Sequence, residues 1–191
     1  KPFQSPAARL GWLIILATIP AGILGLLIKD LVEAAFSSPT MTAIFLIITA
    51  VLLILAEVIG KRKKELSEIT WKDALVIGIS QALAIFPGIS RSGATITGAM
   101  TRDLQRPAAA RFSFLISIPV MMAAGLLASL DMTSMASAAQ WMPIFIPGFI
   151  AAAVAGYLSI RWLLRFLLTQ PLYIFSIYCL VFALFALLFG A

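Results

Sequence analysis

Long apolar runs separated by short polar segments dominate the chain. At a rise of about 1.5 Å per residue, five of these runs are long enough for helices that cross a hydrocarbon core of about 30 Å. They predict five transmembrane helices, over residues 10–28, 41–59, 107–130, 143–164 and 169–189. Between the second and third runs lie two shorter apolar stretches, 74–86 and 89–101, and neither is long enough to cross. We expect residues 74–101 to form a re-entrant helical hairpin that enters and leaves on one side of the membrane.

The composition supports a membrane protein rather than a soluble one. Hydrophobic residues make up 62% of the 191 residues and charged residues only 12%, and the mean hydropathy is +1.06. Such values are typical of a polytopic membrane protein, for which the bilayer is the solvent. The predicted fold class is therefore an all-α membrane helical bundle, with residues 1–191 forming a single integral membrane domain and no soluble domain.

Basic residues are distributed unevenly between the two predicted membrane faces. With the hairpin treated as re-entrant, the face that holds Lys1 receives 12 of the 14 lysines and arginines, the other face keeps Lys29, and Arg91 lies at the hairpin tip. By the positive-inside rule the first face is cytoplasmic and the C-terminus is outside. The net charge of +6 is explained by this topology, so we predict no nucleic-acid partner. The basic loop 60–73 is most simply a cytoplasmic anchor, and a specific anionic-lipid site is the alternative.

Histidine and cysteine set limits on the chemistry. The chain has no histidine, which excludes histidine metal ligands and histidine general bases within it. Its single cysteine, Cys179, lies in an apolar run and has no partner for an intrachain disulfide. Because the sequence starts at Lys1, without an initiator methionine or a signal pattern, we expect it to be the remainder of a longer protein.

A polar, glycine-containing break at residues 86–98 interrupts the apolar pattern within the hairpin. Polar backbone at membrane depth is tolerated only where it is buried in protein or lines a watery cavity, so the break indicates a site. A guanidinium, several hydroxyls and glycines with almost no carboxylate nearby suit an anion, and phosphate above all. A helix that restarts near Ser92 would add its positive N-terminus. The predicted reactive residues are Arg91 and Ser90, and the predicted phosphate-binding residues are Gly88, Ser92, Gly93, Thr95 and Thr97; no metal ligand is predicted.

A structural interpretation of the same break remains open. Small and hydroxylated residues also allow membrane helices to pack closely, and Arg91 could then pair with a carboxylate such as Glu57. A lone arginine near the bilayer centre costs about 2.5 to 3.5 kcal/mol on insertion scales, so it needs either such a partner or an anionic ligand. For Glu57 itself we expect a position at the membrane interface beside Lys61 rather than in a functional cavity.

The residues of the break resemble a known family. Residues 87–95, Pro-Gly-Ile-Ser-Arg-Ser-Gly-Ala-Thr, resemble the second signature motif of the bacterial undecaprenyl-diphosphatase family, also called the bacitracin-resistance family. Segments 19–22, 70–81, 112–115 and 118–119 are similar to further parts of that family, so the resemblance covers essentially the whole chain.

The resemblance implies an integral membrane enzyme that removes the terminal phosphate of undecaprenyl diphosphate and so recycles the lipid carrier for peptidoglycan synthesis. It implies a location in the bacterial cytoplasmic membrane with the active site facing outside, two inverted repeats that each contribute a re-entrant hairpin, and help from a divalent cation, Mg²⁺ or Ca²⁺. It also leaves room for a homodimer. Carried onto this sequence, Arg91 would bind the diphosphate, and Ser90, Ser92 and Thr95 would position it.

The chain departs from the family pattern in one respect. The first repeat of the family brings a glutamate-rich motif and a Ser-Ser-Thr-Gly-His segment, and nothing here matches either. The chain therefore resembles the C-terminal two-thirds of the enzyme, and alone we expect it to be inactive. Two alternatives stay open: a lipid-phosphate transporter or flippase with the same broken-helix anion site, and an inactive truncated remnant. A phosphatidic-acid type of phosphatase is disfavoured because its nucleophile is a histidine.

Overall fold

The computed structural model describes residues 5–133 and 138–189, without the side chains of residue 29, 130–133 and 138–142. Its elements in chain order are α1 (Pro6–Leu27), α2 (Lys29–Phe36), α3 (Pro39–Ile59), the 3₁₀ helix η1 (Leu66–Glu68), α4 (Trp71–Leu83), α5 (Arg91–Thr101), α6 (Arg106–Thr133), α7 (Ala138–Thr169) and α8 (Tyr173–Phe189). Apart from one isolated bridge between Lys64 and Leu104, the described residues contain no β-structure. The predicted all-α class is confirmed.

Four of the described helices are long and apolar enough to cross a membrane. They are α1, α3, the Arg106–Ser129 part of α6 and the Pro143–Thr169 part of α7. Helix α8 is apolar but has only 17 residues within the described part of the chain. These helices fit a multi-pass membrane protein, and the count of five spans stays a prediction. Helix α2 was not expected, because its eight residues include Lys29, Asp30 and Glu33 and interrupt the apolar pattern.

The hairpin region contains two short helices, α4 and α5, that pack against each other. Its two ends meet at one place: the Lys64 N–H donates to the Asp103 carbonyl at 2.8 Å and the Gln105 N–H donates to the Lys64 carbonyl at 2.9 Å. We call this end the hairpin base and the loop 84–90 with the first turn of α5 the hairpin tip. The helical hairpin agrees with the expectation from the sequence, and its re-entrant placement in a bilayer stays a prediction.

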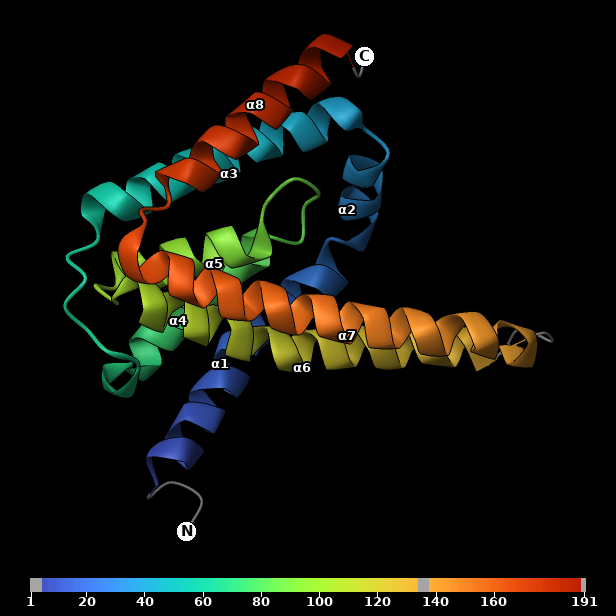
Figure 1. The fold of residues 1–191 in the computed structure, drawn as a ribbon, viewed down its shortest axis with the longest axis horizontal. Coiled ribbons are helices and arrows are strands. Elements are labelled where there is room, and N and C mark those ends of the chain that lie inside the picture. The colour runs from blue at the N-terminus through green and yellow to red at the C-terminus, as the bar shows by residue number, and fades with distance from the viewer. Residues whose placement is uncertain (1–4, 134–137, 190–191) are drawn as a thin grey trace.

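Pairs of helices define the shape of the molecule. Figure 1 shows α8 beside α3, and α7 beside α6, with the α6–α7 pair extending away from the hairpin. The hairpin lies between α3 on one side and α1 and α6 on the other. Small residues allow the closest of these approaches: a Cβ added to Gly78 in α4 would lie 2.5 Å from the carbonyl oxygen of Ala17 in α1.

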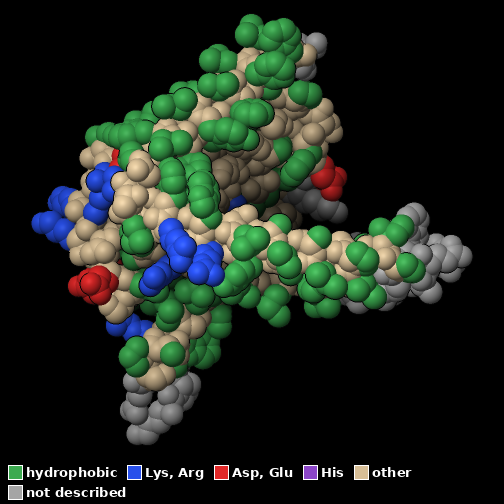
Figure 2. All heavy atoms as spheres, viewed as in Figure 1, with side chains coloured by type: hydrophobic (Ala, Val, Ile, Leu, Met, Phe, Trp, Pro, Cys, Tyr) green, Lys and Arg blue, Asp and Glu red, His purple; other side chains and the backbone are tan. Residues whose placement is uncertain are grey.

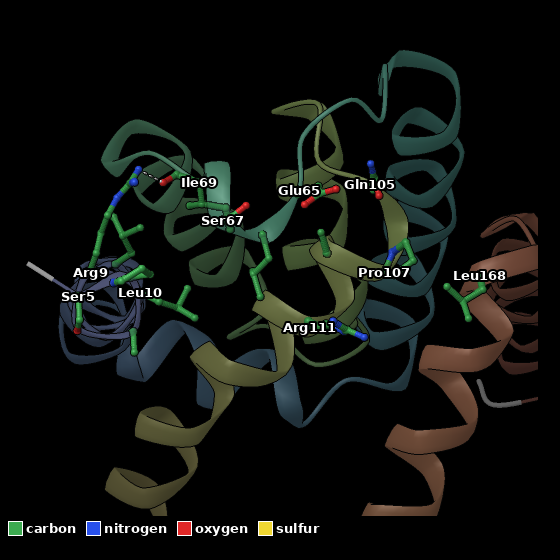
Figure 3. Close-up of a pocket in the computed structure, with 15 residues that line it drawn as sticks. Ser5, Arg9, Leu10, Glu65, Ser67, Ile69, Gln105, Pro107, Arg111 and Leu168 are labelled. Atoms are coloured by element: carbon green, nitrogen blue, oxygen red, sulfur yellow. Dashed lines mark hydrogen bonds between the residues drawn. The ribbon is translucent and has the colours of Figure 1, made fainter.

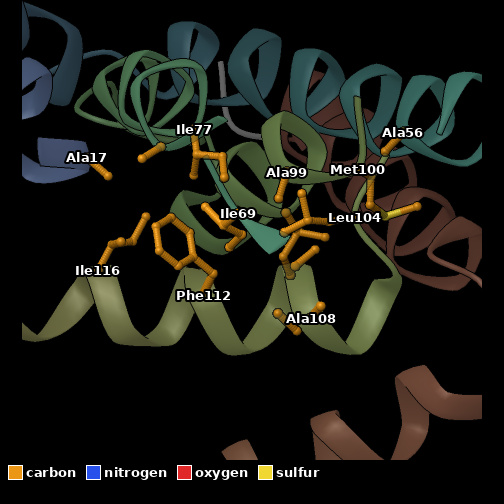
Figure 4. Close-up of a cluster of buried hydrophobic side chains, with 14 of the residues drawn as sticks. Ala17, Ala56, Ile69, Ile77, Ala99, Met100, Leu104, Ala108, Phe112 and Ile116 are labelled. Carbon is orange, nitrogen blue, oxygen red and sulfur yellow. The ribbon is translucent and has the colours of Figure 1, made fainter. Parts of the chain in front are cut away.

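The buried core surrounds the hairpin. Phe112 and Ile116 of α6 pack toward Ile77 of α4 and Ile69, with Ala99 and Met100 of α5 close by (Figure 4). The outer faces of the helices remain apolar and exposed, and no residue in the apolar window of α7 is buried. In the face shown in Figure 2, basic side chains gather around the hairpin base, while hydrophobic side chains cover the extended ends of α6–α7 and α8. This surface suits contact with lipid, since a bilayer needs no polar coat.

Candidate functional site

The hairpin tip carries the start of a helix at the predicted motif. Helix α5 begins at Arg91, and the side chain of its N-cap Ser90 accepts a hydrogen bond from the Gly93 N–H at 3.1 Å. Among the described residues, no acceptor reaches the N–H groups of Arg91 and Ser92. The first N–H groups of a helix carry partial positive charge and can donate to an anion. The predicted restart of a helix near Ser92 is therefore present.

The Arg91 guanidinium has an unused donor. The side chain is half-buried, and its Nη1 atom is fully buried with no hydrogen-bond partner in the described part of the chain. The alternative pairing of Arg91 with Glu57 is wrong, because both carboxylate oxygens of Glu57 accept hydrogen bonds from other groups. Arg62 Nε is also buried without a hydrogen-bond partner, but the Arg62 guanidinium is paired with Glu57 through Nη2. No ion pair is found for Arg91 among the described residues, and a buried cationic donor without an acceptor is costly, so an anionic partner would stabilise it.

Glu57 belongs to the hairpin base instead. Its carboxylate accepts from Arg62 Nη2 at 2.6 Å, from Arg106 Nε at 2.7 Å and from the Leu172 N–H at 2.7 Å. The residue is 5% exposed. The expected neighbour of Glu57 is wrong: the Lys61 N–H donates to the Asp103 carboxylate, and Arg62 and Arg106 neutralise Glu57. Its position at the membrane interface stays a prediction. One buried carboxylate thus joins α3, the following loop, the start of α6 and the segment before α8.

A second buried carboxylate closes the hairpin base. Asp73 is fully buried, accepts from Arg102 Nε at 2.7 Å and from Lys64 Nζ at 3.1 Å, and forms a capping box with Thr70 at the start of α4. Burial of Asp73 opposes its ionisation, but hydrogen bonds from Thr70, Arg102 and Lys64 outweigh that effect and lower its pKa from 3.8 to about 2. Asp73 is therefore a carboxylate at any physiological pH and holds the two ends of the hairpin together.

Ser90 and Ser92 line an apolar cavity. Their hydroxyl oxygens are 3.4 Å apart. The cavity has a volume of about 370 Å³, and Thr49 of α3 also lines it. The rest of the lining is mainly apolar and comes from α3, α7, α8 and the segment between α7 and α8, including Leu46, Leu53, Leu163, Leu167, Leu172, Phe175 and Cys179. Two hydroxyls beside a hydrocarbon-lined space form an amphipathic site, as a lipid with a polar head requires.

Thr95 and Thr97 point to neighbouring helices. The Thr95 hydroxyl is 2.6 Å from the Ser113 hydroxyl of α6 and 2.9 Å from the Arg91 carbonyl oxygen. The Thr97 hydroxyl donates to the Leu52 carbonyl of α3 at 3.2 Å. Both residues are buried. They fasten α5 to α6 and α3, and a direct role for either in phosphate binding stays a prediction.

The two predicted glycines bring the tip close to its neighbours. Gly88 has φ +92°, and a Cβ there would lie 2.2 Å from the Thr42 carbonyl oxygen of α3. Only glycine adopts such a backbone without strain, so α3 and the tip require it. A Cβ at Gly93 would lie 3.0 Å from the Ser90 Cβ. The glycines thus permit tight packing, and close approach of their amides to a phosphate stays a prediction.

Two buried polar residues that were not predicted as site residues lie in the hairpin or against it. Thr49 of α3 is 1% exposed and hydrogen-bonds to the tip at both Gly88 and Ser90. Gln81, in the last turn of α4, is 2% exposed, and neither of its amide atoms has a hydrogen-bond partner among the described residues. The only available signal was a polar side chain inside an apolar run, which by itself indicates a buried partner.

A larger cavity lies elsewhere. A groove of about 870 Å³ runs between the starts of α1 and α6 near η1, close to the hairpin base. Figure 3 shows Arg9 reaching toward Ile69, whose carbonyl it contacts at 2.7 Å, and Arg111 directed toward Leu168. No residue of the 86–98 motif lines this groove. The candidate site is therefore identified by the chemistry of the hairpin tip and not by cavity size.

The described residues do not fit a divalent cation. Hard cations require several oxygen ligands, usually including carboxylates. Within residues 5–133 and 138–189 no group of three or more histidine, cysteine, aspartate or glutamate side chains could hold a metal ion. Both buried carboxylates at the hairpin base are occupied by arginine and lysine.

Comparison with known proteins identifies relatives along nearly the whole chain. Residues 1–185 match the family described as bacitracin resistance protein BacA. An undecaprenyl-diphosphatase of Thermomicrobium roseum is 40% identical over 195 aligned residues, covering 98% of this chain and 70% of the relative. Proteins of the same name are 41% identical in Methanosphaera stadtmanae, over 92% of this chain and 63% of the relative, and 44% identical in Thioalkalivibrio sulfidiphilus, over 96% and 69%. The chain thus spans about two thirds of the length of these relatives.

Proposed function

The chain belongs to the bacitracin resistance protein BacA family, and on that premise we propose that the protein is an undecaprenyl-diphosphate phosphatase. The reaction hydrolyses the terminal phosphate from undecaprenyl diphosphate and leaves undecaprenyl phosphate and inorganic phosphate. Relatives that carry the name undecaprenyl-diphosphatase support this assignment, with identities of about 40% over most of the chain. We propose that this chain supplies the phosphate-binding part of the active site.

The buried Nη1 of Arg91 is the observation that carries the proposal. A planar guanidinium can hold two phosphate oxygens in fixed geometry, which a lysine ammonium does not do. This donor has no partner within the described residues, and we propose that it pairs with an anion bound at the start of α5. The helix N-terminus adds partial positive charge at the same place. Together these groups stabilise charge that develops on phosphate oxygens as the phosphoryl group leaves.

We propose that Ser92 also contacts the phosphate of an amphipathic substrate and that the adjacent cavity binds its hydrocarbon part. In this proposal Ser92 donates its hydroxyl to a phosphate oxygen, while Ser90 caps α5 and orients its first N–H groups. The apolar cavity receives the hydrocarbon next to the diphosphate. Water must reach the terminal phosphate from the open side of the tip.

The proposal includes a membrane topology. We propose five spans and one re-entrant hairpin, with the basic hairpin base on the cytoplasmic face of a bacterial cytoplasmic membrane and the C-terminus outside. The charge asymmetry of the sequence supports this orientation. The bonds that join Arg9 to Ile69 and Arg62 and Arg106 to Glu57 also gather the basic segments at one end of the molecule. The active site would then face outside.

A divalent cation, Mg²⁺ or Ca²⁺, remains part of the proposal on the strength of the family alone. No ligand cluster for it is found among the described residues. Chelation with EDTA should abolish phosphate release, and either ion added back should restore it.

The test is phosphate release by the protein encoded by the complete gene, purified and reconstituted in liposomes with undecaprenyl diphosphate. Hydrolysis yields inorganic phosphate, whereas a flippase moves the diphosphate lipid intact between leaflets. Measurement of both quantities separates the two functions. Residues 1–191 expressed alone should release no phosphate, and intact lipid transfer without phosphate release by the complete protein would overturn the proposal.

A further inference from the structure

We propose that Thr49 is a positioning residue that sets the geometry of the hairpin tip, and through it the direction of Arg91. The Thr49 hydroxyl donates to the Gly88 carbonyl at 3.0 Å and accepts from the Ser90 N–H at 3.0 Å. One side chain of α3 therefore satisfies two backbone groups on either side of Ile89. The inference rests on the proposed function for its kinetic consequence, but its structural part can be tested without it.

Thr49 supplies hydrogen-bond partners for the Gly88 carbonyl and the Ser90 N–H. Ser90 is the N-cap of α5, so its own N–H lies outside the helical hydrogen-bond pattern. The Thr49 side chain is 1% exposed, and both of its hydrogen bonds to the tip are partly buried. Buried backbone N–H and C=O groups must be paired, and here a hydroxyl from a residue about forty positions earlier provides both partners.

The contact belongs to a stripe along one face of α3. Thr42, Phe45 and Thr49 are spaced by three and four residues, which places them on the same helical face. The Thr42 carbonyl lies against Gly88, and the Phe45 ring stacks on Phe86 with centroids 5.1 Å apart. The tip therefore packs along this face of α3, and within the stripe Thr49 is the residue whose side chain hydrogen-bonds to the tip backbone.

The effect of Thr49 reaches Arg91 through Ser90. The Ser90 carbonyl and hydroxyl accept the first hydrogen bonds of α5, from Ala94 and Gly93. A shift of Ser90 would therefore shift the first turn of α5, which contains Arg91. The rest of α5 stays attached to α3 through the bond from Thr97 to the Leu52 carbonyl, so loss of the Thr49 bonds should displace the tip and leave the hairpin in place.

A series of substitutions distinguishes this role from simple packing. Thr49→Ser keeps the hydroxyl, Thr49→Ala removes it but leaves room for a water, and Thr49→Val keeps the volume without a hydroxyl. If only packing matters, activity should follow volume, with valine best and alanine worst. If the hydrogen bonds position Arg91, serine should be best and valine worst, with kcat about 100-fold below wild type for Thr49→Val.

Ser176→Ala is the matched control. The Ser176 hydroxyl is equally buried and donates to the carbonyl of Ala50, the residue next to Thr49, at 3.0 Å. It joins α8 to α3 and, among the described residues, has no hydrogen bond to the tip. We expect Ser176→Ala to lower the thermal stability of the detergent-solubilised protein without lowering kcat more than about threefold. Equal losses of kcat in Ser176→Ala and Thr49→Val would overturn the proposal.

Hydrogen exchange provides a readout that does not depend on catalysis. The Ser90 amide in the purified complete protein should exchange at least about tenfold faster in Thr49→Val than in wild type, with no change in Ser176→Ala. If Thr49→Val does not fold, Thr49→Ala and Thr49→Ser carry the same comparison. Unchanged exchange and unchanged kcat across the series would refute the positioning role, whereas altered exchange in a protein that never releases phosphate would leave it intact and refute the proposed function.

Discussion

Replacement of Arg91 by lysine keeps a positive charge at the hairpin tip and removes the planar fork of donors. The prediction is that Arg91→Lys does not restore function. If the site needed only a point charge, lysine would be an adequate substitute. The structure argues for the fork, because the buried Nη1 atom is a separate donor that no described residue uses, and a diphosphate presents several oxygens that two such donors can hold together.

The size of the effect follows from the number of donors lost. Lysine cannot place two N–H groups along fixed parallel directions, so the substitution removes at least one preorganised donor. Loss of one such donor typically costs about 2.7 to 4 kcal/mol of transition-state stabilisation, or about 100- to 1000-fold in rate. Ser92→Ala removes a neutral donor and should cost less, about 0.5 to 1.5 kcal/mol. Ser90→Ala also removes the cap of α5, which adds a stability cost of about 1 kcal/mol.

The assay is phosphate release from undecaprenyl diphosphate by the complete protein carrying each change. Arg62→Lys is the matched control, since Arg62 is also half-buried but bonds to Glu57 at the hairpin base, away from the tip. Yield and elution after detergent extraction show whether each variant is folded. Retention of more than about a third of wild-type activity by Arg91→Lys would refute bidentate binding. A comparable loss in Arg62→Lys would show that the effect is general to arginine substitution.

Three further predictions concern the hairpin base and the topology. Glu57→Gln leaves buried cations without their charge partner and should lower the free energy of unfolding by about 3 to 5 kcal/mol; a loss below about 1 kcal/mol in denaturant titration would contradict the network. Asp73, with its pKa lowered to about 2, contributes about 2 kcal/mol that is complete above pH 4 and is lost as the pH falls through 2. The stability difference between wild type and Asp73→Asn should thus be constant from about pH 5 to 9 and shrink in acid, and a difference that varies near neutral pH would exclude this explanation. In a Cys179→Ser background, an impermeant thiol reagent applied to intact cells should label Ser37→Cys but not Ser67→Cys, and the reverse pattern would invert the topology.

The hairpin and its motif could be predicted from local features of the sequence. The two short apolar stretches, the Pro87–Gly88 break and the Ser90 cap are all encoded within a few residues, and α4 and α5 form where these signals place them. The partners of Glu57 could not be predicted in the same way, because Arg106 and Leu172 lie 49 and 115 residues further along the chain. Their contact with Glu57 depends on how whole helices pack.

Side-chain direction was the other feature that the sequence did not reveal. Thr95 and Thr97 share a motif with Ser90 and Ser92, but a helix turns each residue by about 100°. Their hydroxyls consequently face α6 and α3. Thr49 was overlooked for the opposite reason, since it sits in an apolar run without any nearby motif. Only the packing of α3 against the tip shows that its hydroxyl bonds to Gly88 and Ser90.

The hairpin is held by hydrogen bonds at both its base and its tip. The base is closed by Asp73 with Arg102 and by the backbone pairing of Lys64, and the tip is bonded to Thr49 of α3. Movement of the tip relative to α3 or to the base would break these contacts. In the proposed topology the anion-binding groups would then stay at one depth, and the proposed lipid substrate would reach them by lateral diffusion within its leaflet.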